Sequence, residues 1–200
     1  VDGSMTRRPR CVAFQSTATN ISQRDALPDS DIYVRDLRRR RTILVSVGVK
    51  GGATNPALSG NCRKVLFEAG GKVYRARVGR GRAKQLGRGS EPDYSRDGRS
   101  ITFVRADGHV VFLHGDRQFR LGRGRSPHVS DYATGHGWAV AYNSDGNVML
   151  GLINRGRKSI QTAVHDGIVG GITARAAGRG IVVWARSSAL FYLNRHTGNS

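Results

Sequence analysis

A phrase that returns about every forty residues constrains the fold of this chain more than any other feature. Pro92-Asp93-Tyr94-Ser95 is repeated loosely 35 residues later at 127–130 and 36 residues earlier at 56–59. A second phrase, Leu-Gly-Arg-Gly, precedes two of these copies, at 86–89 and 121–124. Self-similarity at a period of about 20–50 residues is typical of solenoids and propellers, in which each repeat is one supersecondary unit.

A short triplet that ends in an aromatic residue marks each copy. The aromatic residues lie 53, 36, 39 and 42 residues apart, so five copies account for the whole chain. We expect each ring to fill the gap between neighbouring repeats, where its burial stabilises the fold by roughly 1.5–3 kcal/mol. The five are Phe14, Phe67, Phe103, Tyr142 and Trp184.

The pattern inside a copy is that of strands joined by tight turns. In the third copy, 101–105 and 109–113 are strand candidates, and Ala106-Asp107-Gly108 joins them. Asp-Gly between apolar runs is a strong hairpin signal, because glycine adopts positive φ without steric cost. No stretch has the apolar spacing of an amphipathic helix with caps at both ends, so we expect almost no helix.

These patterns predict an all-β fold, a β-propeller of about five four-stranded antiparallel blades. One such sheet cannot bury both of its faces, and stacking the copies face to face solves that problem. A two-sheet sandwich also has many short strands, but it would not explain a phrase at near-constant spacing. We expect a single domain over 1–200, with repeats at approximately 8–50, 55–89, 91–124, 126–164 and 170–200.

Two segments carry a resemblance to a known family. Pro-x-x-Ser-x-Asp-Gly-Arg-x-Ile-x-Phe at 92–103 resembles the repeat of TolB-like propellers, also called WD-like propeller repeats. Cys11–Asn20 followed by Ser30–Leu37 resembles a form common in bacterial envelope proteins. The resemblance covers essentially 8–200, and it implies a propeller, often periplasmic or extracellular, that acts by binding other molecules.

Both ends of the chain depart from a full set of blades. The first copy lacks a complete inner strand unless Val1-Asp2-Gly3 is its remnant, and the fifth stops near Gly198, where a fourth strand should follow. We therefore expect either a five-bladed ring with imperfect closure or part of a larger ring. No apolar run reaches about 18 residues, so we expect no membrane-spanning helix. The first five residues do not form a secretion signal.

Catalytic motifs are not found in the sequence. It has no Gly-x-Ser-x-Gly elbow, no phosphate loop and no His-Glu-x-x-His, and its aspartates lie mostly beside glycine, where a turn role explains them. Asp25, Asp29 and Asp31 could offer oxygen ligands to calcium, but their spacing is not that of an EF-hand. We therefore expect a non-enzymatic binding or scaffold module with no cofactor and no metal.

One alternative is a propeller enzyme that acts on sugars or lactones at the central channel. The inner strand of each blade lines that channel, and the sequence offers Asp93, His128 and Asp131 there. These three residues are candidates for partner binding as well. Catalysis would need carboxylates or histidines that converge from several inner strands.

The strong basic charge is the one global feature that indicates a partner. Lys and Arg number 33 against 14 Asp and Glu, a net charge of +19 with a pI near 11.4. We expect Arg38–Arg41 at a hairpin tip, and Arg88, Arg123 and Arg125 in connections between blades, to contact an unknown protein or an acidic polymer. Polyanion binding and a merely solvated basic surface are alternatives. Nucleic acid is not expected as the natural ligand, because the motifs lack interleaved aromatic residues that stack bases.

The two cysteines are not expected to pair. Cys11 lies three residues before Phe14, and Cys62 lies five before Phe67. Both separations are odd, so in extended strands each thiol faces opposite to the aromatic residue of its own blade. Equivalent faces point the same way around a ring, which keeps the thiols apart. Loss of strand geometry near Gly60-Asn61 would overturn this argument.

Overall fold

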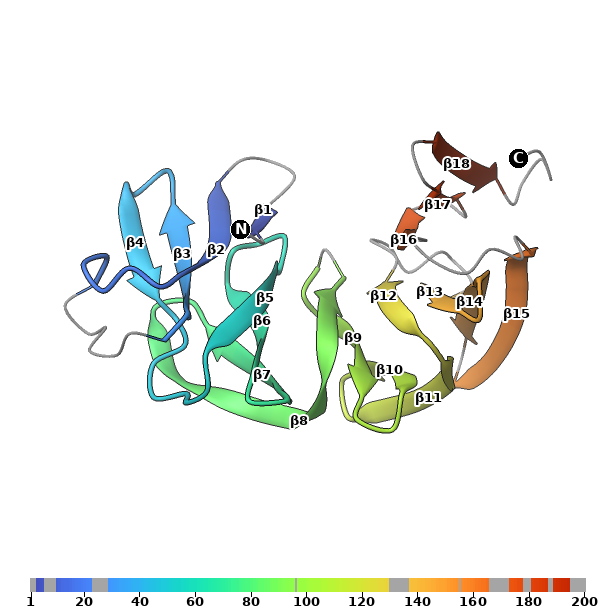
Figure 1. Cartoon of the computed structure of the whole chain (residues 1–200), viewed down its shortest axis with the longest axis horizontal. Helices are drawn as coiled ribbons and strands as arrows, with labels where there is room; N and C mark the ends of the chain where they lie inside the picture. Colours follow the sequence, from blue (N-terminus) through green and yellow to red (C-terminus); the bar gives the residue numbers. More distant parts are fainter. Residues whose placement is uncertain are drawn as a thin grey trace. The chain divides into compact units, whose positions relative to one another are not determined.

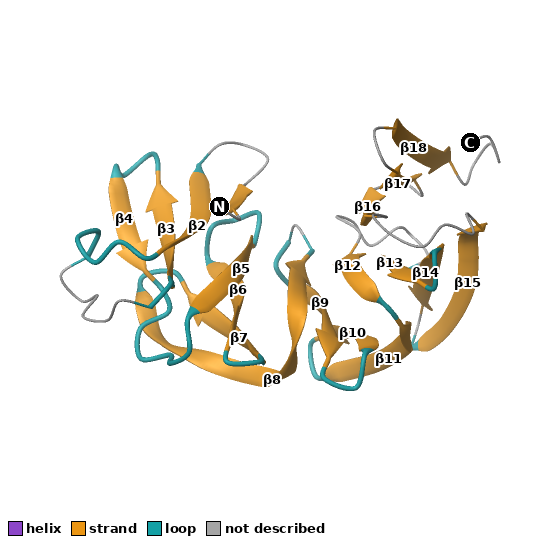
Figure 2. Cartoon of the chain, in the orientation of Figure 1, coloured by secondary structure: helices purple, strands orange, loops and turns teal. Residues whose placement is uncertain are grey.

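Every element that the structure, a computed structural model, describes is a β-strand (Figure 2). The described residues are 3–5, 10–22, 29–95, 97–129, 137–154, 156–165, 173–177, 181–186 and 189–194. The expectation of almost no helix is confirmed over these ranges. The chain divides into two compact units, Val1–Tyr94 and Ser95–Ser200, and each is described by itself.

The first unit holds two sets of four antiparallel strands, ordered β1-β2-β3-β4 and β5-β6-β7-β8 (Figure 1). They correspond to the first two predicted repeats. The short β1 pairs with β2 from Gly3 to Met5, so the first set has an inner strand. The strands are β1 Gly3–Met5, β2 Cys11–Ser16, β3 Asp31–Asp36, β4 Arg41–Leu44, β5 Ala53–Leu58, β6 Lys64–Ala69, β7 Lys72–Arg77 and β8 Arg80–Tyr94.

The second unit holds three antiparallel sets, ordered β9-β10-β11, β12-β13-β14-β15 and β16-β17-β18. The inner strand predicted for the third repeat is the end of β8, just before the boundary between the units. That five blades form one domain, and how a ring would close, stay predictions. The strands are β9 Ser100–Arg105, β10 His109–His114, β11 Arg117–Arg123, β12 Arg125–Val129, β13 Trp138–Ser144, β14 Asn147–Asn154, β15 Arg157–His165, β16 Thr173–Ala177, β17 Ile181–Arg186 and β18 Ala189–Asn194.

The aromatic residues that mark the repeats enter the cores of the two units. Phe67, Phe103 and Tyr142 are buried, whereas Phe14 is half-buried and stacks on Tyr33 with ring centroids 5.6 Å apart. The side chain of Trp184 lies outside the described residues. The period-2 pattern therefore located the core-facing rings in three of the four copies that can be compared.

The repeated Leu-Gly-Arg-Gly phrase lies within β8 in its first copy and at the end of β11 in its second. The Gly89 N–H donates to the Gly71 carbonyl, and the Gly124 N–H donates to the Gly108 carbonyl, both at 3.0 Å. A Cβ on Gly124 would lie 2.5 Å from a ring carbon of Tyr142, so only glycine fits there. Packing therefore requires glycine at this position of the second copy.

The turn that precedes β6 is held by the hydroxyl of Ser59. This hydroxyl accepts the N–H of Lys64 at 3.0 Å and donates to Asn61 Oδ1 at 3.0 Å, and its oxygen also lies 2.9 Å from the Lys64 carbonyl oxygen. The Asn61 oxygen accepts the N–H of Arg63 at 3.0 Å. The side chains thus take the place of part of a strand ladder, and the chain bends before β6 begins.

The turn that precedes β9 repeats these contacts 36 residues later. The Ser95 hydroxyl accepts the N–H of Ser100 at 2.9 Å and donates to Asp97 Oδ1 at 2.7 Å. The Asp97 oxygen accepts the N–H of Arg99 at 3.0 Å. Gly98, at φ +66°, therefore occupies the position of Cys62, whose φ is +59°. Positive φ is costly for a residue with a Cβ and free for glycine.

Cys11 and Cys62 form a disulfide, so the expectation that they stay apart was wrong. Their Cα atoms lie 6.0 Å apart, a normal bridging distance. The expectation from the odd separations holds only if both residues lie in extended strands. Cys11 begins β2, but Cys62 lies in the turn before β6 with a left-handed backbone, which turns its side chain away from the strand alternation. The chain thus loses strand geometry near Gly60-Asn61, which is the condition under which the two thiols can meet.

Candidate functional site

A groove of about 750 Å³ opens in the first unit where four separate segments meet. The segments are the start of β2, the β3–β4 turn with the first part of β4, the turn before β6, and the β7–β8 turn. The volume falls within the range usual for ligand sites. The lining residues are Arg10, Cys11, Asp36, Arg39, Arg41, Ile43, Asn61–Lys64 and Arg77–Arg80.

Among the described residues, the groove is lined by seven basic residues and a single acidic one, Asp36. All of the basic residues are exposed except Lys64, which is half-buried. Cations gathered around a concave surface make a positive potential that attracts anions. The seven are Arg10, Arg39, Arg41, Arg63, Lys64, Arg77 and Arg80.

The one carboxylate in the groove is already engaged by its own turn. Asp36 is 6% exposed, and its Oδ1 accepts the backbone N–H of Arg39 at 3.0 Å. This hydrogen bond, followed by the nearby charges of Arg10 and Arg39, lowers the pKa of Asp36 below its ordinary value of 3.8 although burial opposes the shift. Asp36 is therefore ionised at neutral pH, and a single negative charge cannot neutralise seven positive ones.

The disulfide holds two of these arginines on the wall of the groove. Cys11 and Cys62 are both buried, and both line the groove. Arg10 directly precedes Cys11 and Arg63 directly follows Cys62. The covalent link between β2 and the turn before β6 therefore limits how far the two arginines can move apart.

Along the β7–β8 hairpin, basic residues stand directly opposite one another. The register pairs Lys72 with Arg88, Arg75 with Lys84 and Arg77 with Arg80. Like charges in such positions destabilise a sheet, by roughly 0.2–1 kcal/mol each. The Arg77–Arg80 pair lines the groove, so this unfavourable arrangement lies where an anion would relieve it.

A second cavity, of about 570 Å³, continues the groove along β4. The two cavities share Arg41, Ile43, Arg77, Gly79 and Arg80. A Cβ on Gly79 would lie 3.7 Å from a guanidinium nitrogen of Arg41 and 3.9 Å from Cδ1 of Ile43, which places the β7–β8 turn against β4. The lining residues are Ser22, Arg41–Val45, Val47, Arg77 and Gly79–Arg82.

The arginines predicted to contact a partner belong to both units. Arg38–Arg40 form the β3–β4 turn and Arg41 begins β4, all of them exposed, but only Arg39 and Arg41 line the groove. Arg88, in β8, is exposed and belongs to the first unit. Arg123 and Arg125 are exposed in the second unit, on either side of the change from β11 to β12.

The residues expected at a central channel belong to different units or lie outside the described residues. Asp93 is half-buried in β8 of the first unit, and His128 is half-buried in β12 of the second. Asp131 lies outside the described residues. Their role as a channel site stays a prediction.

Five basic residues of the groove were absent from the predicted set: Arg10, Arg63, Lys64, Arg77 and Arg80. They come from three segments that are far apart in the sequence, and only folding brings them together. The Arg-Val-Gly-Arg sequence of 77–80 was the one available signal, because it places basic residues on both sides of a glycine turn.

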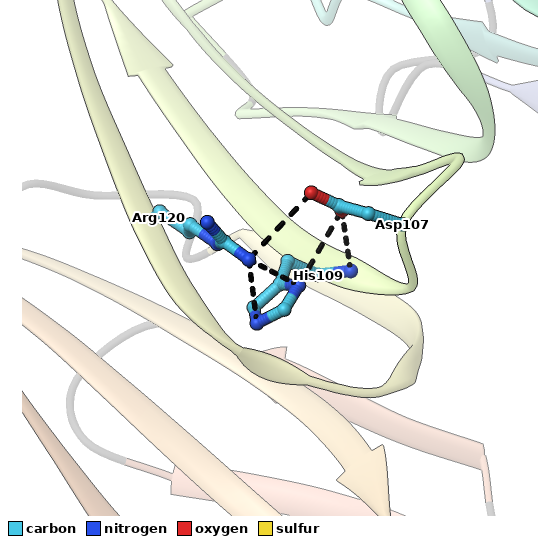
Figure 3. Close-up of polar contacts among 3 residues, drawn as sticks. All are labelled: Asp107, His109 and Arg120. Atoms are coloured by element: carbon cyan, nitrogen blue, oxygen red, sulfur yellow. Dashed lines mark hydrogen bonds and ion pairs between the residues drawn. The ribbon is translucent and has the colours of Figure 1, made fainter.

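The second unit has a polar cluster of its own on the β9–β10–β11 strands (Figure 3). Arg120 Nη2 lies 2.9 and 3.0 Å from the two ring nitrogens of His109 and 3.6 Å from Asp107 Oδ2. Asp107 Oδ1 accepts the backbone N–H of His109 at 3.1 Å, and this hydrogen bond lowers the pKa of the Asp107 carboxyl. Because the carboxylate and the guanidinium are substantially exposed, the cluster has the properties of a surface ion pair and stabilises the hairpin only slightly.

The described residues contain no group of three or more His, Cys, Asp and Glu side chains placed to hold a metal ion. Among the same residues, no helix is long and apolar enough to cross a membrane. The polar residues that the structure describes around the groove are almost entirely cationic.

No family model matches the sequence, and no curated protein matches it. Solved structures do. TolB from Acinetobacter baumannii is similar over 80% of this chain and 42% of its own, with 19% identity and a TM-score of 0.53. The complex of KlAtg21 with the coiled coil of AgAtg16 matches over 82% of this chain and 58% of its own, with 12% identity and a TM-score of 0.58.

A nidogen/laminin complex contains a third similar structure. It covers 100% of this chain and 77% of its own, with 8% identity and a TM-score of 0.61. The chain thus spans about two fifths of TolB and just over half of the matched chain in the KlAtg21 complex. Identities this low speak to the fold alone, and that fold is of the β-propeller type.

Proposed function

We propose that this chain is a non-enzymatic binding module whose basic groove takes up an acidic segment of a partner protein. The groove carries the proposal, because seven basic residues surround one engaged carboxylate. Guanidinium groups form forked, charge-assisted hydrogen bonds with carboxylates, which favours glutamate and aspartate side chains as ligands. The propeller-type fold supports a binding role without naming the partner.

A protein fits the groove better than a nucleic acid does. The lining residues that the structure describes include no aromatic side chain on which a base could stack. Ile43 and Val78 contribute apolar surface among the charges. A protein segment can match both, with carboxylates for the arginines and apolar side chains for the apolar surface.

We further propose that the module works outside the cytoplasm of a bacterium. The Cys11–Cys62 disulfide supports an oxidising compartment, because such bonds are rare where glutathione and thioredoxin keep thiols reduced. The resemblance of 92–103 to the TolB-like repeat supports a bacterial envelope protein.

The binding proposal is tested with a fluorescein-labelled decaglutamate peptide and fluorescence anisotropy. We expect Arg41→Gln/Arg80→Gln to weaken binding at least about tenfold, or about 1.4 kcal/mol. Affinity should also fall as salt rises, because exposed charges are screened. The matched control is Arg99→Gln/Arg117→Gln, which removes two exposed arginines of the second unit. Equal weakening by both double variants would show that only net charge matters, and would overturn the proposal.

A heparin fragment of equal charge separates a protein ligand from an acidic polymer. We expect the groove variant to affect the peptide far more than the heparin fragment. If only heparin binding depends on Arg41 and Arg80, the groove binds a sulfated or envelope-type polymer and the protein partner is wrong. The non-enzymatic part is tested on ester, lactone and glycoside panels, where turnover abolished by Asp93→Asn or His128→Ala would contradict it.

The variant Arg80→Glu is expected to change stability and peptide binding in opposite directions. It replaces a cation that faces Arg77 across the hairpin with a carboxylate. We expect this variant to unfold at higher urea, by roughly 0.2–1 kcal/mol of added stability, while it loses peptide binding. Lower stability together with unchanged binding would contradict a functional reason for the like-charge pair.

A further inference from the structure

We propose that the acidic segment binds in an extended conformation, as an additional strand along the outer edge of β4. This inference rests on the proposed function and adds a binding mode to it. Backbone hydrogen bonds to β4 would supply part of the affinity, and the surrounding arginines would select acidic side chains. Such strand addition is a common way to recognise extended peptides.

The strand β4 ends its set in the described part of the chain. The order is β1-β2-β3-β4, and Figure 1 shows β4 beyond β3, on the side away from β2. Thr42, Ile43 and Leu44 are each half-buried, so each keeps part of its surface exposed among the described residues. An edge strand presents backbone groups that can pair with another chain.

The register shows which backbone groups face outward. Val45 donates its N–H to the Ile32 carbonyl at 2.9 Å, which makes Ile32 and Val45 a hydrogen-bonded pair. In an antiparallel ladder these pairs alternate with pairs that do not exchange hydrogen bonds. Two pairs therefore do not exchange backbone hydrogen bonds: Tyr33 with Leu44, and Arg35 with Thr42. The N–H and C=O groups of Thr42 and Leu44 point away from β3.

The second cavity lies along this same edge. Its lining includes five consecutive residues, Arg41–Val45, together with Arg77 and Gly79–Arg82 of the neighbouring hairpin. Five residues of added strand would extend about 17 Å. Arg80 and Arg82 are exposed beside this path, whereas Val45 is buried and Val47 half-buried, which offers cationic and apolar contacts along one segment.

The charge of the edge favours an acidic strand over a second copy of this chain. Strand β4 has only four residues and begins with Arg41, and a short, positively charged edge resists pairing with its own kind. Antiparallel pairing of two β4 strands would also bring the arginines of the β7–β8 turn of each copy into one cavity. A strand that alternates glutamate with valine would instead place carboxylates near arginines and methyl groups near the apolar lining.

The test compares Thr42→Pro with Thr42→Val in the whole chain. Both variants lose the side-chain hydroxyl that accepts Arg35 Nη1 at 3.1 Å, but only proline removes the outward N–H. Proline is tolerated on an edge strand where the N–H faces outward. The probe is a fluorescein-labelled peptide, Glu-Val-Glu-Val-Glu-Val-Glu. We expect Thr42→Pro to bind at least tenfold more weakly than Thr42→Val, which keeps the outward N–H, and equal binding by the two variants would contradict strand addition at this position.

A second measurement keeps the proposal testable if Thr42→Pro does not fold. The same peptide, N-methylated at every second residue, is titrated onto the wild-type protein, once in each of the two phases of alternation. We expect one phase to lose at least tenfold in affinity and the other to lose little, because only alternate amides face β4. Equal binding by both methylated peptides, combined with a loss for Arg41→Gln/Arg80→Gln, would overturn strand addition and leave the acidic-segment proposal standing. No loss for Arg41→Gln/Arg80→Gln would remove both proposals.

Discussion

The turn that precedes β6 in the first unit and the turn that precedes β9 in the second share their hydrogen bonds and a left-handed backbone position, but different residues occupy that position. Ser59 and Ser95 hold the two turns in the same way. The left-handed position is Gly98 in one and Cys62 in the other. The repeat therefore tolerates a strained residue where that residue forms a covalent bond, and uses glycine where it does not.

The largest effect in this comparison should come from the disulfide. We expect Cys11→Ala/Cys62→Ala to lower the free energy of unfolding of the oxidised protein by about 2–4 kcal/mol, because the bond closes a loop between residues 51 apart. Urea unfolding measures it. With reductant, the wild type should unfold at nearly the same urea concentration as the double variant. Reductant should not change the urea midpoint of the double variant. Equal midpoints for the oxidised wild type and the double variant would show that the bond contributes nothing.

The serine hydroxyls should have the next largest effect. We expect Ser59→Ala and Ser95→Ala each to lower stability by about 1–3 kcal/mol, because each removes the acceptor of a backbone N–H. The loss should be greater for Ser95→Ala, since Ser100 is fully buried and Lys64 is not. Ser144→Ala serves as the control, because its hydroxyl makes only an exposed contact of 3.3 Å with Asp145. The opposite order for the two turns would contradict this account.

The left-handed position itself can be tested once the disulfide is removed. In a Cys11→Ala background, we expect Cys62→Gly to be about 1 kcal/mol more stable than Cys62→Ala, because glycine has no Cβ to strain. Gly98→Ala should in turn lose about 1–2 kcal/mol. If Gly and Ala at position 62 give the same urea midpoint, the turn relaxes out of the left-handed region when the disulfide is absent.

The features of the fold that can be predicted from the sequence are those set by contacts between residues close together in the chain. The Asp107-Gly108 hairpin and the burial of Phe67 follow from neighbours within a few residues, and both were predicted correctly. The pairing of Cys11 with Cys62 was not, because one backbone angle in a turn decided it. The glycine at position 98 is itself a signal of a left-handed backbone. The cysteine at position 62 gives no such signal, although it occupies the equivalent position of the other turn.

The candidate site was predictable only in part for a related reason. Arg39 and Arg41 were expected near a hairpin tip, and they do line the groove. Arg10 and Arg63 are 53 residues apart in sequence, and the disulfide brings their segments together. Charge alone could not identify them among 33 basic residues. A long-range contact had to be known first.

The smallest effect should come from another difference between the turns, Asn61 against Asp97. We expect Asp97→Asn to change stability by no more than about 0.5 kcal/mol. One oxygen does the work in both turns, since Asn61 Oδ1 accepts the Ser59 hydroxyl and the Arg63 N–H as Asp97 Oδ1 accepts their equivalents. The measurement is urea unfolding at pH 7, with Asp97→Ala as the variant that removes the acceptor. A loss for Asp97→Asn as large as that for Asp97→Ala would mean that the charge, rather than the shared oxygen, holds the turn before β9.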